Sequence, residues 1–468
     1  MGKRLSLMKI PFAARLSRAM RTASERARNF AARHALLRFE PLRQLRNSDR
    51  WDVTTISRYQ LIQLNNLLHH ARTDTPGYAE KFAAAGVPAR LPGLAALADV
   101  PFFTKDELRS TPDRFASTSL SVARRDTITS GGTTGTPTRF TVDRAVYQPL
   151  FTAHLHAMWH RAGYPPGARC LDLSASLATP PGELREFGDG RHYLSIAQLD
   201  PLTRKHWIPV VQRLNPEFII GFPSTVSAFA RLIENEGKLP ALRGVLLASE
   251  VLLPGQREEL ARRLGVRVFT WYGMSELAGF ASGCEHADTY HFLPSAGIVE
   301  IVGDDGTVRN IPGDEGEIVL TGFLNRATPF IRYRTGDRGV IGEPCPHCRR
   351  AHAILASIDG RSQDCLLSGN GRRVPLSALN FHSDEFRRVL VHQFVQDAAG
   401  LVTLRLVALD GFGDTDRIAI TALVSGRLGP GFILTLELVS LIERTPRGKI
   451  PVIVRRDSPA PPATPSLA

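Results

Sequence analysis

A chain of 468 residues with 43% hydrophobic and 22% charged residues has the size and composition of a globular protein with two or more domains. No apolar stretch approaches the roughly 18 residues that predict a membrane-spanning helix, and no signal-peptide pattern opens the chain. Five cysteines are too few for a disulfide framework at this length. These properties argue against integral membrane, secreted and disulfide-stapled proteins, and we expect a cytoplasmic protein.

The first fifty residues form a basic extension. They hold 13 Lys and Arg against 3 Asp and Glu, so most of the net charge of +13 lies here, and the remainder predicts no specific nucleic-acid binding. From Phe12 to Phe30, apolar residues recur at helical spacing with arginines largely on the other face. Such a helix can bind the anionic inner face of a membrane. It can equally pack on the rest of the chain, stay poorly ordered or act as a transit peptide.

Beyond this extension, helical and strand patterns alternate. We expect helix over residues 56–90, interrupted at Pro76, because one stripe of the segment is apolar. Short apolar runs at Phe218–Gly221, Val245–Ala248 and Val268–Trp271, separated by amphipathic stretches, predict parallel strands of an α/β domain. The helical stripe consists of Leu61, Leu64, Leu67, Leu68 and Ala71.

Further strand candidates extend the prediction toward the C-terminus. Glu317–Thr321 predicts a strand of a different, barrel-like part, and Leu401–Ala408 and Ile418–Leu423 are strand candidates of a smaller C-terminal part. The fold class is therefore α/β, with parallel sheets and a small β-barrel in a large N-terminal domain and a smaller α+β domain after it.

The chain is expected to divide into an extension, two folded domains and a tail. A boundary near Asp359-Gly360 separates the two folded domains, and the last residues form a Pro, Ala and Ser tail that we expect to be disordered. The expected organisation is an extension at 1–50, a large domain at 51–358, a small domain at 359–456 and a tail at 457–468.

A segment rich in glycine and hydroxyl groups runs from Thr129 to Thr138. Glycines let the backbone turn tightly and point successive N–H groups into one concavity, and hydroxyls add donors for phosphate oxygens. The segment predicts a polyphosphate-binding loop, although it lacks the end of a Walker loop, and a plain polar surface loop is the alternative. The candidate phosphate-binding residues are Ser130, Gly131, Gly132, Thr133, Thr134 and Gly135.

Other short motifs accompany this loop in a fixed order. They are Val100–Lys105 before it and, after it, Tyr272–Glu276, Thr321-Gly322, Pro329–Asp337, Asp359–Asp364 and Arg444–Lys449. In order and spacing, from about Leu61 to Arg456, the chain resembles the adenylate-forming superfamily of acyl-CoA synthetases, and within it the phenylacetate-CoA ligase and CapK-like capsule-biosynthesis group. The resemblance implies an AMP-forming ligase that joins a carboxylic acid to ATP, transfers the acyl group to CoA, and moves its small domain between the two steps.

The resemblance also implies roles for residues around ATP. Ser130, Thr133 and Thr134 are the main donors to the β- and γ-phosphates, and Thr136 stands where many relatives have a lysine. A magnesium ion prefers carboxylate oxygens, and by resemblance Glu276 holds it. The remaining implied nucleotide contacts are Tyr272 and Gly273 near the adenine, Ser249 and Glu250 in the adenine pocket wall, Ser275 at the α-phosphate, and Asp337 and Arg361 at the ribose.

Lys449 is the candidate catalytic lysine. It lies in a Pro- and Gly-bounded loop that can bring one ammonium to the charge developing between the carboxylate and the α-phosphate, an interaction made mainly in the transition state. A solvated basic run is the alternative. The position that usually serves as the pivot of the small domain is Gln363 here, followed by Asp364, which departs from the acidic or lysine residue of relatives.

Four cysteine and histidine residues predict a metal site. Cys345 and Cys348 form a short knuckle, and Cys284 and His291 lie upstream, so the four can bind zinc as a Cys₃His set. A redox pair or unligated thiols are the alternatives. Cys170 and Cys365 are expected to be ordinary core residues.

Two functional alternatives accompany the ligase prediction. In the first, the acyl group passes to an amine, a hydroxyl or a carrier instead of CoA. In the second, the protein is a non-catalytic, membrane-associated assembly factor on the same fold. The pattern does not identify the carboxylic acid.

Overall fold

The computed structural model describes residues 45, 47–130, 138–174, 179–186, 189–234, 236–361, 365–375, 384–445 and 449–456, with Arg361 and Pro375 described by their backbone alone. The predicted amphipathic helix at 12–30, Gly131–Gly135 with Thr136 of the phosphate loop, Gln363 with Asp364, and the tail at 457–468 lie outside the described residues. Within the described part of the chain, no helix is both long and apolar enough to cross a membrane.

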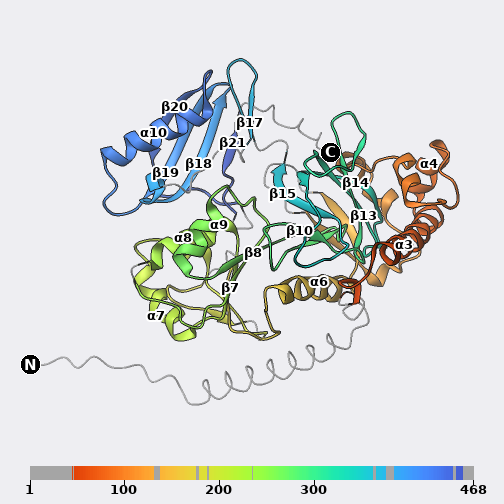
Figure 1. Ribbon diagram of the computed structural model, residues 1–468, viewed down its shortest axis with the longest axis horizontal. Helices are drawn as coiled ribbons and strands as arrows, with labels where there is room; N and C mark the ends of the chain where they lie inside the picture. The colour runs from red at the N-terminus through yellow and green to blue at the C-terminus, as the bar shows by residue number, and fades with distance from the viewer. Residues whose placement is uncertain are drawn as a thin grey trace, which may run out of the picture.

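One mixed sheet of thirteen strands organises the larger part of the described chain (Figure 1). Its order is β12-β11-β13-β14-β15-β10-β9-β8-β7-β6-β3-β5-β4. The strands from β5 to β8 are parallel, and those from β8 to β12 are antiparallel. The sheet therefore changes character at β8, whose carboxyl end carries the Tyr272–Glu276 motif.

The parallel half confirms the strands expected from the apolar runs. Its strands are β3 (Cys170–Leu173), β5 (Arg191–Tyr193), β6 (Phe218–Gly221), β7 (Gly244–Leu247) and β8 (Arg267–Gly273), with β4 (Arg185–Glu186) at the edge. β3, β6 and β7 are buried along their whole length because helices pack against them, as is typical of an α/β layer. The helices are α6 (Tyr147–Arg161), α7 (Arg204–Leu214), α8 (Pro223–Ile233) and α9 (Gln256–Leu264).

The antiparallel half continues the same sheet. The segment expected in a barrel-like part, Glu317–Thr321, lies within β13 (Glu315–Gly322), between β11 and β14. The other strands are β9 (Phe280–Gly283), β10 (Tyr290–Phe292), β11 (Gly297–Val302), β12 (Val308–Arg309), β14 (Phe330–Ile341) and β15 (Ile354–Arg361).

The N-terminal helices pack on this antiparallel half. α3 (Val53–Asp74) buries Leu64, Leu67, Leu68 and Ala71 in one core with side chains of β13 and β14, which confirms the predicted stripe except for Leu61, which is only partly buried. Pro76 opens a second helix rather than ending helical structure, because a proline needs no hydrogen-bond partner for its nitrogen in a first turn. The remaining elements here are α4 (Pro76–Ala84), η1 (Leu94–Asp99), α5 (Lys105–Ser110), η2 (Pro112–Phe115), η3 (Val122–Arg124), β1 (Arg125–Thr129), β2 (Arg139–Asp143) and η4 (Ile196–Gln198).

The small domain is a four-stranded sheet of order β20-β19-β18-β21 with α10 on one face (Figure 1). The strand expected at Leu401–Ala408 is β19, but the strand expected at Ile418–Leu423 is wrong, because this segment lies within α10 (Asp414–Leu428). Its β-branched run suggested a strand, whereas Asp416, Ile420, Val424 and Leu428 are buried at four-residue spacing, the period of a helix. The other elements are β16 (Cys365–Leu367), β17 (Arg373–Pro375), η6 (Asp384–Phe386), β18 (Val389–Ala398), β20 (Ile433–Leu438) and β21 (Ile453–Arg455).

The segment before α5 is fixed to β14 by an aromatic side chain. The backbone N–H of Phe103 donates to Arg332 O at 3.0 Å, and its carbonyl accepts from Arg334 N at 2.9 Å. The Phe103 ring is fully buried against the rings of Tyr78, Phe115, Phe330 and Tyr333. This packing fixes the start of α5, where Lys105 lies.

We expect Phe103→Ala to lower the free energy of unfolding by about 3–5 kcal/mol, because removing a buried ring leaves a cavity. The adjacent Phe102→Ala is the control, since Phe102 is only partly buried. Thermal unfolding midpoints of the two variants measure the difference. Equal midpoints would contradict the packing role of Phe103.

Candidate active site

A cavity of about 280 Å³ lies at the carboxyl ends of β7 and β8, where the small domain meets the large one. Ligands of open parallel sheets bind at such strand ends. The cavity brings together most predicted site residues that the structure describes. Those lining it are Ser130, Ser249, Glu250, Tyr272, Gly273, Ser275, Glu276, Asp337 and Lys449, together with the unpredicted Lys105.

Tyr272 and Asp337 meet across the cavity wall. The Tyr272 hydroxyl donates to Asp337 Oδ2 at 2.8 Å, and burial raises the pKa of this tyrosine. Gly273 allows the close approach of β9, because a Cβ there would lie 2.7 Å from the Phe280 ring. Arg361 is the backbone partner of Asp337 in the β14–β15 register, and its side chain is outside the described part of the chain.

Glu276 is a buried carboxyl group, with only 5% of the residue exposed. Burial raises its pKa, whereas the nearby Lys105 and the Tyr333 hydroxyl, which donates to Oε1 at 3.3 Å, lower it. A single carboxyl group lining this cavity fits a magnesium ion, which takes one or two carboxylates and completes its shell with phosphates and water.

Lys105 is the site residue that the sequence analysis missed. It begins α5, its ammonium donates to the carbonyl of Thr335, and it lines the cavity. The Val100–Lys105 motif was the available signal, but it served only as a landmark for the order of motifs. The contact that brings it to the cavity, between Phe103 and β14, joins segments more than 200 residues apart.

The described residues on either side of the predicted phosphate loop belong to a β-hairpin. β1 and β2 pair in antiparallel register, and Ser130 N donates to Thr138 O at 2.8 Å at the base of the loop. The Ser130 hydroxyl accepts from Thr138 N at 3.1 Å. Ser130 lines the cavity.

Lys449 enters the cavity from the small domain. Its Nζ donates to the carbonyl of Ser249 at 2.6 Å, and Ser249 has a φ of 70°, a strained value for a residue other than glycine. Glu250 accepts from Ser224 N at 3.0 Å and Ser224 Oγ at 3.1 Å, at the start of α8. Burial raises the pKa of Glu250, and Lys449 and Arg444 lower it.

Ser275 joins the site to α6, because the Tyr147 hydroxyl donates to its carbonyl at 2.9 Å. Lys449 and Lys105 therefore supply ammonium groups from different domains to one cavity that also holds the Glu276 and Asp337 carboxyl groups. This arrangement can bring two anions together and stabilise the charge between them.

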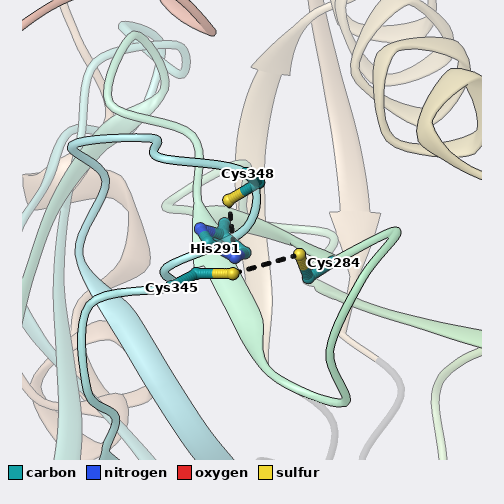
Figure 2. A group of neighbouring side chains, drawn as sticks. All are labelled: Cys284, His291, Cys345 and Cys348. Atoms are coloured by element: carbon teal, nitrogen blue, oxygen red, sulfur yellow. Dashed lines mark hydrogen bonds between the residues drawn. The ribbon is translucent and has the colours of Figure 1, made fainter.

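The predicted metal ligands form a second site, shown in Figure 2. Cys284 follows β9, His291 lies on β10, and the Cys345–Cys348 knuckle follows β14; their ligand atoms all lie within 4.8 Å of one another. Cys284 Sγ lies 3.8 Å from Cys345 Sγ, and Cys348 Sγ lies 3.7 Å from His291 Nε2. Zn–S bonds of about 2.3 Å in tetrahedral geometry separate two sulfurs by about 3.8 Å, so the donor set fits zinc.

Glu276→Gln is expected to raise the thermal midpoint at about pH 8. Burial raises the folded-state pKa of Glu276 above its ordinary value of 4.5, so once the pH exceeds that raised pKa the folded protein holds a carboxylate where the neutral form is favoured. The gain should shrink as the pH falls and vanish below the ordinary value of 4.5, where the folded and unfolded states are both protonated. Midpoints over a pH series test this, with Glu258→Gln on the exposed face of α9 as control. A constant difference at all pH values would contradict it.

Comparisons with known proteins agree with this geometry. Residues 187–325 match the AMP-binding enzyme family. Phenylacetate-coenzyme A ligase of Aromatoleum evansii is 30% identical over 327 residues, which cover 66% of this chain and 71% of the relative. The enzyme of the same name from Pseudomonas putida is 28% identical over 335 residues, covering 67% and 72%.

Solved structures share the fold. A 2-hydroxyisobutyryl-CoA ligase in its postadenylation state superposes with a TM-score of 0.70 at 19% identity, covering 87% of this chain and 91% of that one. The same ligase in its thioesterification state gives a TM-score of 0.59 over the same shares, also at 19% identity. The chain belongs to the AMP-binding enzyme family, within its phenylacetate-coenzyme A ligase group.

Proposed function

We propose that the protein is an ATP-dependent, AMP-forming ligase that joins a carboxylic acid to CoA. A carboxylate oxygen of the acid attacks the α-phosphorus of ATP, and the bond to pyrophosphate breaks. The CoA thiolate then attacks the acyl carbon and releases AMP. The observation that carries the proposal is the position of Lys449, whose ammonium reaches the cavity of Glu276 and Asp337 from the other domain.

We assign a separate role in these two steps to each residue of the cavity. Lys449 and Lys105 stabilise the negative charge that develops as the acid meets the α-phosphate. Asp337, already a hydrogen-bond acceptor for Tyr272, accepts from the ribose hydroxyls. Glu276 holds Mg²⁺, which when bound neutralises phosphate charge. The hairpin loop after Ser130 binds the β- and γ-phosphates, and Arg361 adds a ribose contact.

Two finer points of the proposal are the acceptor of the acyl group and the exclusion of a non-catalytic role. The phenylacetate and 2-hydroxyisobutyryl relatives are CoA ligases by name, which supports CoA over an amine, a hydroxyl or a carrier. The presence of Lys449, Glu276 and Asp337 in one cavity argues against a non-catalytic assembly factor. A peripheral membrane contact through residues 1–50 stays a prediction of the sequence.

We further propose that Cys284, His291, Cys345 and Cys348 bind one structural zinc ion. These four residues come from the segment directly after β9, from β10 and from the loop between β14 and β15. Zinc bound there would crosslink the segment after β9, β10 and that loop near the start of β8, where Arg267 donates to the carbonyls of Cys284 and Glu285.

Lys449→Ala is expected to slow acyl-adenylate formation by about a hundredfold or more while ATP binding changes little, because its charge contact acts mainly in the transition state. ATP–pyrophosphate exchange across a panel of carboxylic acids measures this. Lys205→Ala, an exposed lysine of α7, is the matched control. A folded Lys449→Ala variant with the wild-type exchange rate would exclude the proposed role.

Protein purified without chelators should contain about one zinc per chain, and Cys348→Ser should lose it with a lower thermal midpoint, because metal binding stabilises the folded state. Cys170→Ser is the control, since Cys170 lies in β3 outside the cluster. Elemental analysis and thermal unfolding provide the two readouts. Zinc-free wild-type protein would overturn the assignment.

A further inference from the structure

The two domains interlock through apolar side chains. Leu390 of β18 packs into the core formed by α7, α8 and α9, and Leu253, which precedes α9, packs into the core of the small domain. In Figure 1 the small domain, in blue, lies next to α8, which contacts β18. Apolar contacts of this kind are non-directional, so they hold the domains together without fixing one angle between them.

A buried arginine provides directional contacts at this interface. Arg231 of α8 has a side chain only 3% exposed. Its Nη2 donates to both carboxylate oxygens of Glu259, at 3.1 and 3.3 Å. Its Nη1 crosses to the small domain, where it donates to the carbonyl of Val389 and, at 3.4 Å, to that of Leu390.

The contacts of Arg231 with the carbonyls of Val389 and Leu390 are not needed to neutralise the charge of Glu259. Arg263, one turn along α9 from Glu259, also donates to Glu259 Oε1, at 3.0 Å, and pairs with Glu234 of the same domain. Arg263 is as buried as Arg231, yet both of these carboxylate partners belong to the large domain. The two arginines therefore differ in that Arg231 bonds to backbone carbonyls of the small domain.

β18 connects the Arg231 contact to the catalytic lysine. Val389 and Leu390 begin this strand, and farther along it Phe394 N donates to Val452 O at 2.7 Å, three residues after Lys449. The Gln393 side chain donates to the carbonyl of Pro451 at 2.9 Å. The strand thus spans about 17 Å from Val389, which contacts Arg231, to Phe394, which bonds to the backbone segment that carries Lys449.

We propose that Arg231 is a positioning residue that holds the small domain, and with it Lys449, in the arrangement for adenylation. The proposal rests on the proposed function. Rotation of the small domain moves the carbonyls of Val389 and Leu390 away from α8, so these contacts stabilise one arrangement only. Arg231 therefore promotes adenylation and opposes the move toward thioester formation.

Chemical labelling of Lys449 tests this without knowledge of the acid. The full-length protein is treated with acetic anhydride, and acetylation of Lys449 is compared by peptide mass spectrometry with that of the exposed Lys205 and Lys238. The Arg231→Met variant loses hydrogen bonds made by a charged group. We therefore expect acetylation of Lys449 to be about tenfold faster in this variant than in the wild type. Arg263→Met, the matched control, should label at the wild-type rate.

Two results would overturn the proposal. The first is a wild-type rate of Lys449 acetylation in folded Arg231→Met. The second is an equal increase of that rate in Arg263→Met, which would assign the effect to the ion pairs of Glu259. If Arg231→Met does not fold, Arg231→Lys keeps a cation beside Glu259 but lacks the second nitrogen that donates to both carbonyls, and labelling of Lys449 should again rise.

With an acid that the wild type adenylates, Arg231→Met should slow pyrophosphate exchange without slowing thioester formation from added acyl-adenylate. Absence of exchange in the wild type would contradict the proposed function and leave the labelling result to judge Arg231.

Discussion

The Lys449 ammonium crosses a domain boundary to reach the carbonyl of Ser249, and the function that we propose depends on that crossing. Each domain alone is incomplete: the large one holds Glu276 and Asp337, and the small one brings the lysine. Joining two anions requires positive charge that is fixed before the reaction begins. A lysine on a separate domain can supply that charge for one step and leave for the next.

The sheet positions the rest of the site through its change from parallel to antiparallel pairing. β7 and β8 end at the cavity, and β9 returns directly beside β8, which is why Gly273 must lack a side chain. Three residues with positive φ lie at or next to this region: Ser249, Leu277 and Arg332. Such strain persists only where surrounding packing enforces it, and it clusters at functional sites.

Local patterns predicted much of this arrangement. The parallel strands followed from apolar runs between amphipathic stretches, and the α3 stripe from its helical period, because both signals are carried by neighbouring residues. The run at Ile418–Leu423 misled because β-branched residues also occur in helices, and only burial at four-residue spacing distinguishes the two. The C-terminal part of the chain was therefore predicted less well than the parallel sheet.

Lys105 and Arg231 could not be found in this way, since what places each is a contact between distant segments. Lys105 depends on the bridge from Phe103 to β14, and Arg231 on a carbonyl 158 residues away. The cluster of Cys284, His291, Cys345 and Cys348 was predictable because the Cys345–Cys348 spacing is itself a signal, although the geometry of the cluster was not.

The most direct test of the ligase assignment measures the formation of pyrophosphate and AMP from ATP by the wild-type chain. Incubation with ATP, Mg²⁺ and a panel of carboxylic acids should yield pyrophosphate exchange with at least one acid in the absence of CoA. Addition of CoA should then release AMP and form thioester in equal amounts. Release of ADP and phosphate, or no exchange with any acid, would contradict the assignment.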